Sequence, residues 1–269
     1  MCIVGEAGVG KSMICEKYAN MFPSYDIDVE QRLSKTIKPV LLARVPAKAS
    51  DATLATSLLA ALGDPAYSQG TSTNKTFRLK ALLKECGVEL IIIDEVQHIY
   101  DRDSQKIIQV ASNWIKDLIV ETRIPTILTG LPDLITVVER NEQLNSRFKY
   151  RERLSLFDLS NPNEEKIFRS FLYVVDLKLP LIQRSNLADP DTALMLFEAS
   201  GGQMRTLMEQ ILLPATLRAL EQNAIKLSKE IIVNEINRLH GTTKICMKEP
   251  NKKCKPKKKS ESVFRKAVI

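Results

Sequence analysis

The chain of 269 residues is long enough to bury a substantial core, and its 44% hydrophobic and 26% charged residues are ordinary for a globular protein. No apolar run approaches the roughly 20 residues that span a bilayer, so no membrane partner is expected. Residues 244–269 hold ten Lys and Arg and two Glu, a charge of +8 that leaves −1 of the net +7 for residues 1–243. A nucleic-acid surface on the body therefore cannot be inferred from net charge.

Short apolar segments alternate with amphipathic segments through the first part of the chain, which is typical of an α/β fold with a largely parallel sheet. The five predicted strands are residues 2–4, 40–45, 89–93, 126–128 and 153–156. The predicted helices between them are residues 11–21, 52–62, 75–86 and 104–121. The first strand begins at residue 1, so either the protein is this compact or an N-terminal segment is missing.

After about Ser160 the pattern changes to one helix after another, predicted at residues 163–175, 190–199, 203–222 and 228–239. The expected organisation is an α/β domain (1–159), a small all-helical domain (160–243) and a Lys-rich flexible tail (244–269). The tail lacks periodic hydrophobic residues, so it is expected to be disordered on its own.

A glycine-rich loop follows the first strand and precedes the first helix. Its residues Gly5, Glu6, Ala7, Gly8, Val9, Gly10, Lys11 and Ser12 fit the pattern G-x-x-x-x-G-K-[ST]. The glycines let successive backbone N–H groups face phosphate oxygens, and the helix adds its positive N-terminal end. Lys11 is predicted to reach the β- and γ-phosphates, and Ser12 is predicted to bind Mg²⁺.

Two carboxylates end the predicted strand at residues 89–93. Asp94 is predicted to hold Mg²⁺, and Glu95 is predicted to polarise the attacking water as a general base. The base-reading motif NKxD of GTPases fails at its last position in residues 74–77, so ATP is the preferred nucleotide. The sequence therefore predicts an enzyme that hydrolyses ATP with Mg²⁺.

The five cysteines are scattered without a CxxC pair, which favours reduced thiols in a cytoplasmic protein. Only two histidines accompany the cysteines, so a zinc site has almost no support.

Four motifs together resemble the TniB/TnsC transposition regulators, a family of AAA+ ATPases. The motifs are VGEAGVGKS (4–12), CGVELIIIDEVQH (86–98), IPTILTGLP (124–132) and NEQLNSRF (141–148). The resemblance covers nearly all of residues 1–243 and implies an AAA+ core with a parallel five-stranded sheet and a helical lid. Such proteins usually carry an N-terminal helical segment that is absent here, and the tail matches no family pattern.

The resemblance also implies roles for individual residues. Thr129 would be the sensor-one residue that reports the γ-phosphate or positions water, although it could equally cap a strand. Arg147 resembles the arginine finger that completes a neighbouring subunit's site, with Arg140 as its rival. Arg205 resembles the sensor-two arginine of the lid.

By the same resemblance the protein would assemble on duplex DNA as a homo-oligomer, either a hexameric ring or a helical filament. It would link this target to a transposase and a target-selector protein. Lys48, Thr71 and Lys75 are the candidate DNA contacts, in segments expected to face a central pore. The tail is a basic linker, a source of non-specific DNA affinity or a docking segment.

Two other functions remain open. One is an AAA+ initiator or loader of the replication-origin type, although the chain is too short after the lid for a winged-helix domain. The other is a nucleotide-gated signalling scaffold that binds ATP and scarcely hydrolyses it.

Overall fold

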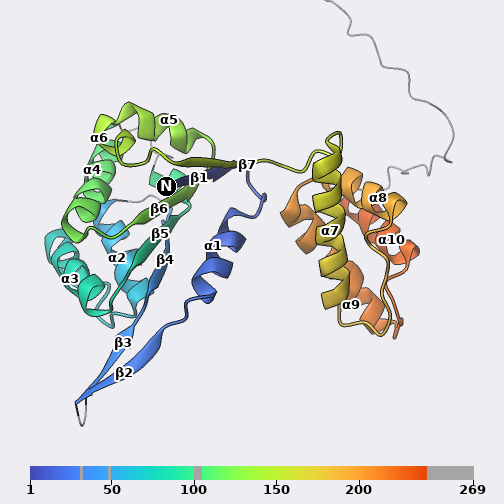
Figure 1. The fold of residues 1–269 in the computed structure, drawn as a ribbon, viewed down its shortest axis with the longest axis horizontal. Coiled ribbons are helices and arrows are strands. Elements are labelled where there is room, and N and C mark those ends of the chain that lie inside the picture. Colours follow the sequence, from blue (N-terminus) through green and yellow to red (C-terminus); the bar gives the residue numbers. More distant parts are fainter. Residues whose placement is uncertain (31–32, 48–49, 100–104, 241–269) are drawn as a thin grey trace, which may run out of the picture.

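The computed structural model describes residues 1–30, 33–47, 50–99 and 105–240. Lys48 and the predicted tail, residues 244–269, lie outside these ranges. The predicted α/β class is confirmed: five parallel strands form one sheet in the order β4-β5-β6-β1-β7 (Figure 1). The strands are β1 (Cys2–Gly5), β4 (Val40–Arg44), β5 (Leu90–Asp94), β6 (Thr126–Gly130) and β7 (Arg151–Leu154).

Helices cover both faces of this sheet. Alternate strand residues point to opposite sides, and apolar side chains on each side pack against helices. Leu41, Ile91 and Ile93 belong to the larger core, which they share with side chains of the helices on that face. Ile92 belongs to a smaller cluster with Cys15 on the opposite face. The helices of this part of the chain are α1 (Lys11–Asn20), α2 (Asp51–Leu62), α3 (Ser72–Glu85), α4 (Gln105–Thr122), α5 (Asp133–Arg140) and α6 (Glu142–Asn145), with a 3-10 turn η1 (Val96–Ile99) after β5.

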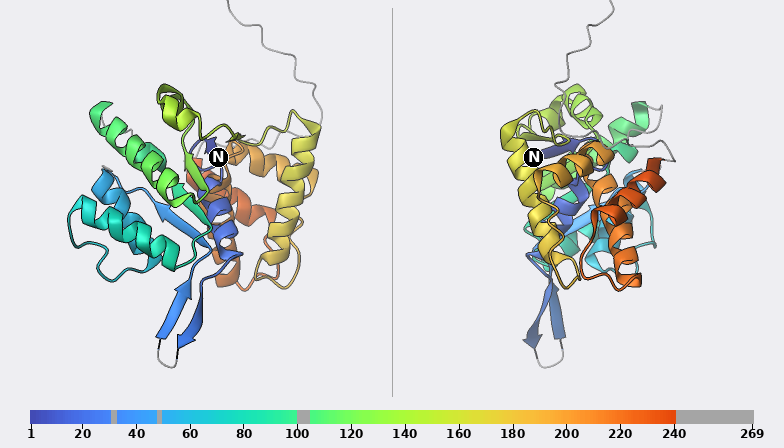
Figure 2. Two further views of the ribbon diagram at one scale, coloured as in Figure 1. Left: turned by 60° about the vertical axis from the view of Figure 1, so that its left-hand side comes forward. Right: turned by 90° about the vertical axis from the view of Figure 1, so that its right-hand side faces the viewer.

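Several elements differ from the sequence prediction. An antiparallel hairpin of β2 (Tyr25–Glu30) and β3 (Leu33–Ile37) follows α1 and projects from the body (Figure 2). Helices α5 and α6 were also not predicted. The last strand lies two residues earlier than expected, since its predicted range of 153–156 corresponds to β7 at Arg151–Leu154.

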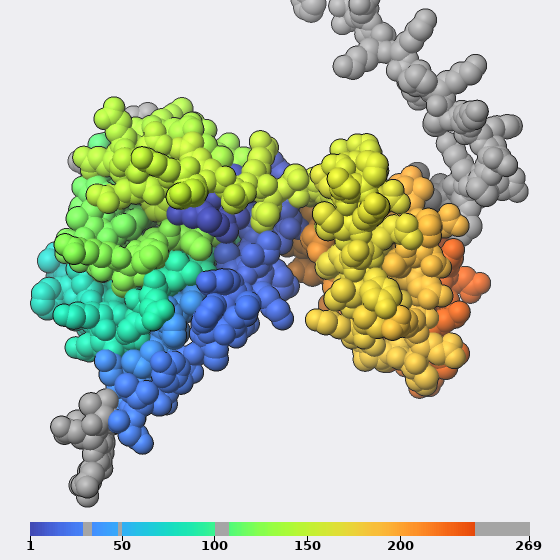
Figure 3. Space-filling view, viewed as in Figure 1, coloured from blue at the N-terminus to red at the C-terminus, as the bar shows by residue number. Residues whose placement is uncertain are grey.

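The remaining described residues form a helical part with its own core. It consists of α7 (Pro162–Lys178), α8 (Pro190–Ser200), the π-helical segment η2 (Thr206–Leu212), α9 (Leu213–Glu221) and α10 (Lys229–His240). The single helix predicted at residues 203–222 is thus a continuous helical run that is π-helical in η2 and α-helical in α9, with Pro214 in the first turn of α9. Phe168, Leu196 and Ile211 are fully buried in this second core. The helical part lies beside the α/β part and next to its N-terminal segment (Figure 3).

None of the helices among the described residues is both long enough and apolar enough to cross a membrane.

Candidate nucleotide site

The carboxyl ends of four parallel strands bring the predicted site residues to one edge of the sheet. The register pairs Arg44 of β4 with Asp94 of β5. It also pairs Ile3 of β1 with Thr129 of β6, directly before the glycine-rich loop. Residues from distant segments therefore meet because parallel strands end together, as ligand sites in such sheets do.

The loop between β1 and α1 encloses the side chain of Lys11. Lys11 is 7% exposed, and its ammonium group donates to the carbonyl oxygens of Gly5 at 2.7 Å and Glu6 at 2.8 Å. Burial lowers the pKa of Lys11, whereas the carboxylates of Glu95, Asp94 and Glu6 raise it. The loop thus holds a cation between its carbonyl groups and the acidic ends of the strands.

Two glycines of this loop adopt backbone angles that other residues rarely adopt. The φ angle is +79° at Gly8 and +103° at Gly10, where α1 begins without a side-chain cap. A left-handed residue beside right-handed ones makes neighbouring N–H groups converge, which suits an anion. A side chain at Gly5 would collide with the carbonyl oxygen of Leu154, so β7 also requires glycine there.

Asp94 is almost fully buried, at 1% exposure, and both of its carboxylate oxygens have partners. Oδ1 accepts hydrogen bonds from the hydroxyl of Thr129 and, at 2.9 Å, from the backbone N–H of Glu95. Oδ2 lies 3.8 Å from Nε of Arg44, which also pairs with Glu16. A buried carboxylate held by two hydrogen bonds and an ion pair is fixed in position, which suits a group that must orient a cation.

Glu95 follows Asp94 in a strained conformation, with φ at +60°. Its carboxylate accepts a hydrogen bond from Nε2 of Gln97 and lies 3.9 Å from Nε2 of His98. Oε1 of Gln97 is buried without a hydrogen-bond partner, facing Gly130. Backbone strain beside a buried unpaired oxygen is common at functional sites.

The lid contacts the glycine-rich loop directly through the segment that precedes η2. Nε2 of Gln203 donates to the carbonyl oxygen of Ala7 at 2.7 Å. The backbone N–H of Arg205 donates to the carbonyl oxygen of Gly8 at 3.0 Å. The Arg205 guanidinium is near enough to lower the pKa of Lys11 further and lies 4.0 Å from Glu209. The predicted lid arginine therefore lies beside the loop.

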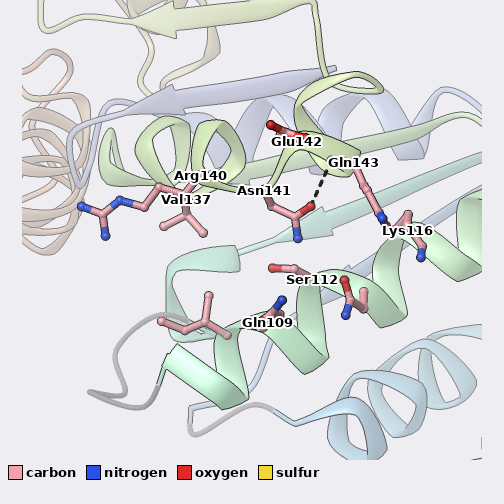
Figure 4. Close-up of a pocket in the computed structure, with 10 residues that line it drawn as sticks. Gln109, Ser112, Lys116, Val137, Arg140, Asn141, Glu142 and Gln143 are labelled. Atoms are coloured by element: carbon pink, nitrogen blue, oxygen red, sulfur yellow. Dashed lines mark hydrogen bonds between the residues drawn. The ribbon is translucent and has the colours of Figure 1, made fainter.

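The two candidate finger residues lie elsewhere. Arg147 is exposed in the turn after α6, and no ion pair engages it within the described part of the chain. Arg140 lines a cavity of about 570 Å³ between α4 and the α5–α6 segment (Figure 4). The hydroxyl of Ser112 in this cavity is buried and lacks a partner. None of the loop residues, Asp94 or Glu95 lines it, so it is separate from the nucleotide site.

The candidate DNA contacts have different surroundings. Thr71 caps α3, where its hydroxyl accepts from the N–H of Asn74 at 3.3 Å. Lys75 lies within α3 and donates to the hydroxyl of Thr56 at 2.9 Å, so it is not in a loop. Lys48 lies outside the described residues.

Two residues of the site had not been singled out from the sequence. Arg44 could have been found, because it lies one residue before the end of the predicted strand 40–45, near the edge where Asp94 was expected. Gln203 could not, since only the packing of the lid brings it to the loop.

Comparisons with known proteins identify related folds and one family. The family described as bacterial TniB protein matches residues 1–157. No curated protein matches the chain.

Solved structures of archaeal proteins share the fold. Cdc6p from Pyrobaculum aerophilum superposes with a TM-score of 0.57 at 14% identity, covering 87% of this chain and 59% of that one. The Aeropyrum pernix ORC1 protein in complex with DNA gives 0.59 at 15%, covering 88% and 59%. The Aeropyrum pernix ORC2 protein in ADPNP and ADP complexes gives 0.60 at 14%, covering 89% and 61%. The chain thus spans 59–61% of these structures, and at such identities the likeness concerns the fold.

Proposed function

This chain belongs to the bacterial TniB protein family of AAA+ ATPases, and from that premise we propose that it hydrolyses ATP with Mg²⁺, assembles on duplex DNA and links this target to a transposase. The observation that carries the proposal is the position of Asp94. It is buried at the end of β5, bonded to Thr129 of β6, and contributes to the charge around Lys11 of the glycine-rich loop. A buried carboxylate for the metal, a polar strand end and a loop lysine at one sheet edge support a phosphoryl-transfer site.

The glycine-rich loop would bind the phosphates of ATP. Its N–H groups and the N-terminal end of α1 offer partial positive charge, and Lys11 adds a full one. Lys11 donates to the carbonyl oxygens of Gly5 and Glu6, so it would exchange these partners for phosphate oxygens. Solved ORC2 complexes with ADPNP and ADP support adenine nucleotides as ligands of this fold.

The donor set fits magnesium. Ser12 supplies a hydroxyl and Asp94 a carboxylate, and oxygen ligands of this kind are those that Mg²⁺ prefers. When bound, Mg²⁺ offsets the negative charge of the phosphate oxygens. Arg44 and Thr129 would keep Asp94 correctly oriented for this role.

Glu95 would accept a proton from the attacking water. Its carboxylate is held by Gln97, and together with Asp94 and Glu6 it raises the pKa of Lys11. The proposed general base thus follows β5 at the same sheet edge as the lysine of the glycine-rich loop. Thr129 would orient the same region from β6.

Hydrolysis would require a second copy of the chain. Arg147 is exposed and unpaired among the residues that the structure describes, whereas transition-state charge on the γ-phosphoryl group needs an additional cation. An arginine supplied by a neighbouring subunit meets this need, and it makes activity depend on assembly into a ring or filament. Arg140 is the alternative finger.

DNA is the proposed platform for assembly. The ORC1 structure in complex with DNA supports DNA binding by a protein of this fold. Binding without sequence preference needs phosphate contacts alone, and Thr71, Lys75 and Lys48 remain the candidates. A transposase and a target selector are the proposed protein partners.

The same fold likeness favours a second candidate function. An initiator or loader of the origin type would also bind ATP and DNA, and the archaeal structures carry such names. It would load or open DNA without recruiting a transposase, so a transposase pull-down in the presence of ATP and DNA separates the two functions.

Electron microscopy of negatively stained protein tests the proposal. The chain and its Glu95→Gln variant are imaged with ATP or a slowly hydrolysed analogue, with and without duplex DNA. Rings or filaments that require both ligands, and that persist in Glu95→Gln after wild-type assemblies have dissolved, support the proposal. Monomers under every condition contradict assembly and the trans role of Arg147.

A further inference from the structure

The lid fixes the direction of two consecutive peptide groups in the glycine-rich loop. The carbonyl oxygen of Ala7 accepts from Nε2 of Gln203, and the carbonyl oxygen of Gly8 accepts from the N–H of Arg205. The peptide bonds of the described chain are all trans. In a trans peptide the C=O and N–H groups point in opposite directions.

This geometry determines where the N–H groups of the loop point. Because the carbonyl of Ala7 points to the lid, the N–H of Gly8 points away from it. The same reasoning applies to the carbonyl of Gly8 and the N–H of Val9, which indeed lies 3.5 Å from the carbonyl oxygen of Glu6 inside the loop. The direction of the Gly8 N–H is thus fixed through Gln203, and that of the Val9 N–H through the backbone of Arg205.

The Gln203 side chain is itself held in the required orientation. Thr206 donates its hydroxyl hydrogen to Oε1 of Gln203, which leaves Nε2 to face Ala7. A Cβ atom at Gly8 would lie 2.8 Å from Cδ of Gln203, so the amide lies flat against the glycine. Gly202, at φ +72°, brings the chain into this position where a side chain would meet the carbonyl of Phe157 at 2.7 Å.

We propose that Gln203 is a positioning residue of the nucleotide site, which orients the N–H group of Gly8 for phosphate binding by holding the carbonyl of Ala7. The inference rests on the proposed function, since it concerns the same ATP site. It makes nucleotide affinity depend on a lid side chain that need not touch the nucleotide. Thr206 contributes indirectly, because its hydroxyl holds the side-chain amide of Gln203 in place.

Nucleotide titrations of the full chain test this role. The probes are ADP and ATP carrying a fluorescent methylanthraniloyl group. Gln203→Ala loses one hydrogen bond to the loop and should weaken both affinities about fivefold. Gln203→Glu places a carboxylate against the carbonyl of Ala7 and should weaken them further. Thr206→Val frees the amide to rotate and should give a smaller loss than Gln203→Ala.

Gln210→Ala is the matched control, because Gln210 is an exposed glutamine of η2 with no hydrogen bond among the described contacts. In steady-state hydrolysis Gln203→Ala should raise KM more than it lowers kcat, with a melting temperature like that of Gln210→Ala. Equal affinities in all four variants would overturn the inference and leave the proposed function intact. A lower melting temperature with unchanged affinity would also overturn it, since the role would then be structural. No nucleotide binding by the wild-type chain would overturn both.

Discussion

Thr129, at the end of β6, donates its hydroxyl hydrogen to Oδ1 of Asp94, at the end of β5. Both side chains are buried, and the two residues lie on neighbouring parallel strands that end at the glycine-rich loop. The bond therefore joins the residue expected to sense the γ-phosphate to the residue expected to hold the metal. A displacement of either strand end would therefore move the other residue through this hydrogen bond.

Thr129→Val should lower kcat, because it removes a hydrogen bond to a charged group while keeping the side-chain volume. Such a bond contributes about 1.5–3 kcal/mol, so a loss of about 10- to 100-fold is expected. Thr129→Ser keeps the hydroxyl and should retain most activity. Steady-state hydrolysis measures both variants, and a valine variant as active as the serine variant would exclude the role.

Ser112→Ala should stabilise the protein. The hydroxyl of Ser112 is buried in α4 without a partner, and alanine both removes this penalty and favours the helix. The free energy of unfolding should rise by about 1 kcal/mol, as measured by urea denaturation. Gln109→Ala, on the exposed side of α4, measures the helix contribution alone. A destabilised Ser112→Ala variant would mean that the hydroxyl has a partner.

Gly5→Ala should abolish nucleotide binding and lower the melting temperature. Its methyl group would collide with the backbone carbonyl of Leu154, which belongs to the sheet and cannot turn aside. Gly63→Ala is the contrasting variant: Gly63 is left-handed, unlike Gly5, and has open space around it, so its cost is backbone strain alone. Calorimetry of both variants separates the two effects, and an equal loss in each would argue against the collision.

The Cys15 thiol should make stability depend on pH in alkaline solution. Burial raises its pKa from 9.0 to about 11, with Asp94 and Glu16 adding to the rise. The folded state then holds the proton more tightly than the unfolded state, so this contribution is complete below pH 9.0 and is lost as the pH rises through about 11.

Cys15→Ala removes this titration. The difference in unfolding free energy between the wild type and Cys15→Ala should therefore shrink as the pH rises, when unfolding is followed by urea denaturation from about pH 8 upward. Cys2, whose pKa burial also raises to about 11, is present in both proteins and cancels in the difference. A difference that stays constant with pH would show that Cys15 titrates normally.

The sequence was most informative where a strand is buried on both faces. Continuous apolar residues ending in Asp94 gave the position of β5 to within a residue, and the loop pattern located β1 and α1. Helix α5 was missed because Gly130 and Pro132 read as a loop, although Leu134 and Val138 pack into the main core. The β2–β3 hairpin was missed because its alternation is short and rich in charge.

Contacts between distant segments could not be predicted in the same way. Nothing in the sequence around Gln203 indicates that its amide reaches Ala7, since that contact depends on how the lid packs. Lys75 was expected at the start of a helix, but Thr71 caps α3 earlier, so Lys75 lies within the first turns of that helix. Arg44 lies near the end of a predicted strand, but its pairing with Asp94 follows from the register of β4 and β5, which is known only when the strand order is known.

The central claim is that each ATP site is completed by Arg147 of a neighbouring copy. The most direct test mixes two variants, Glu95→Gln and Arg147→Ala, and measures ATP hydrolysis in the presence of duplex DNA. Each variant alone should be inactive, because one lacks the base and the other lacks the finger. The mixture should recover part of the wild-type rate, since some junctions join an intact Glu95 to an intact Arg147. A mixture as inactive as its components, or full activity of Arg147→Ala alone, would contradict the account.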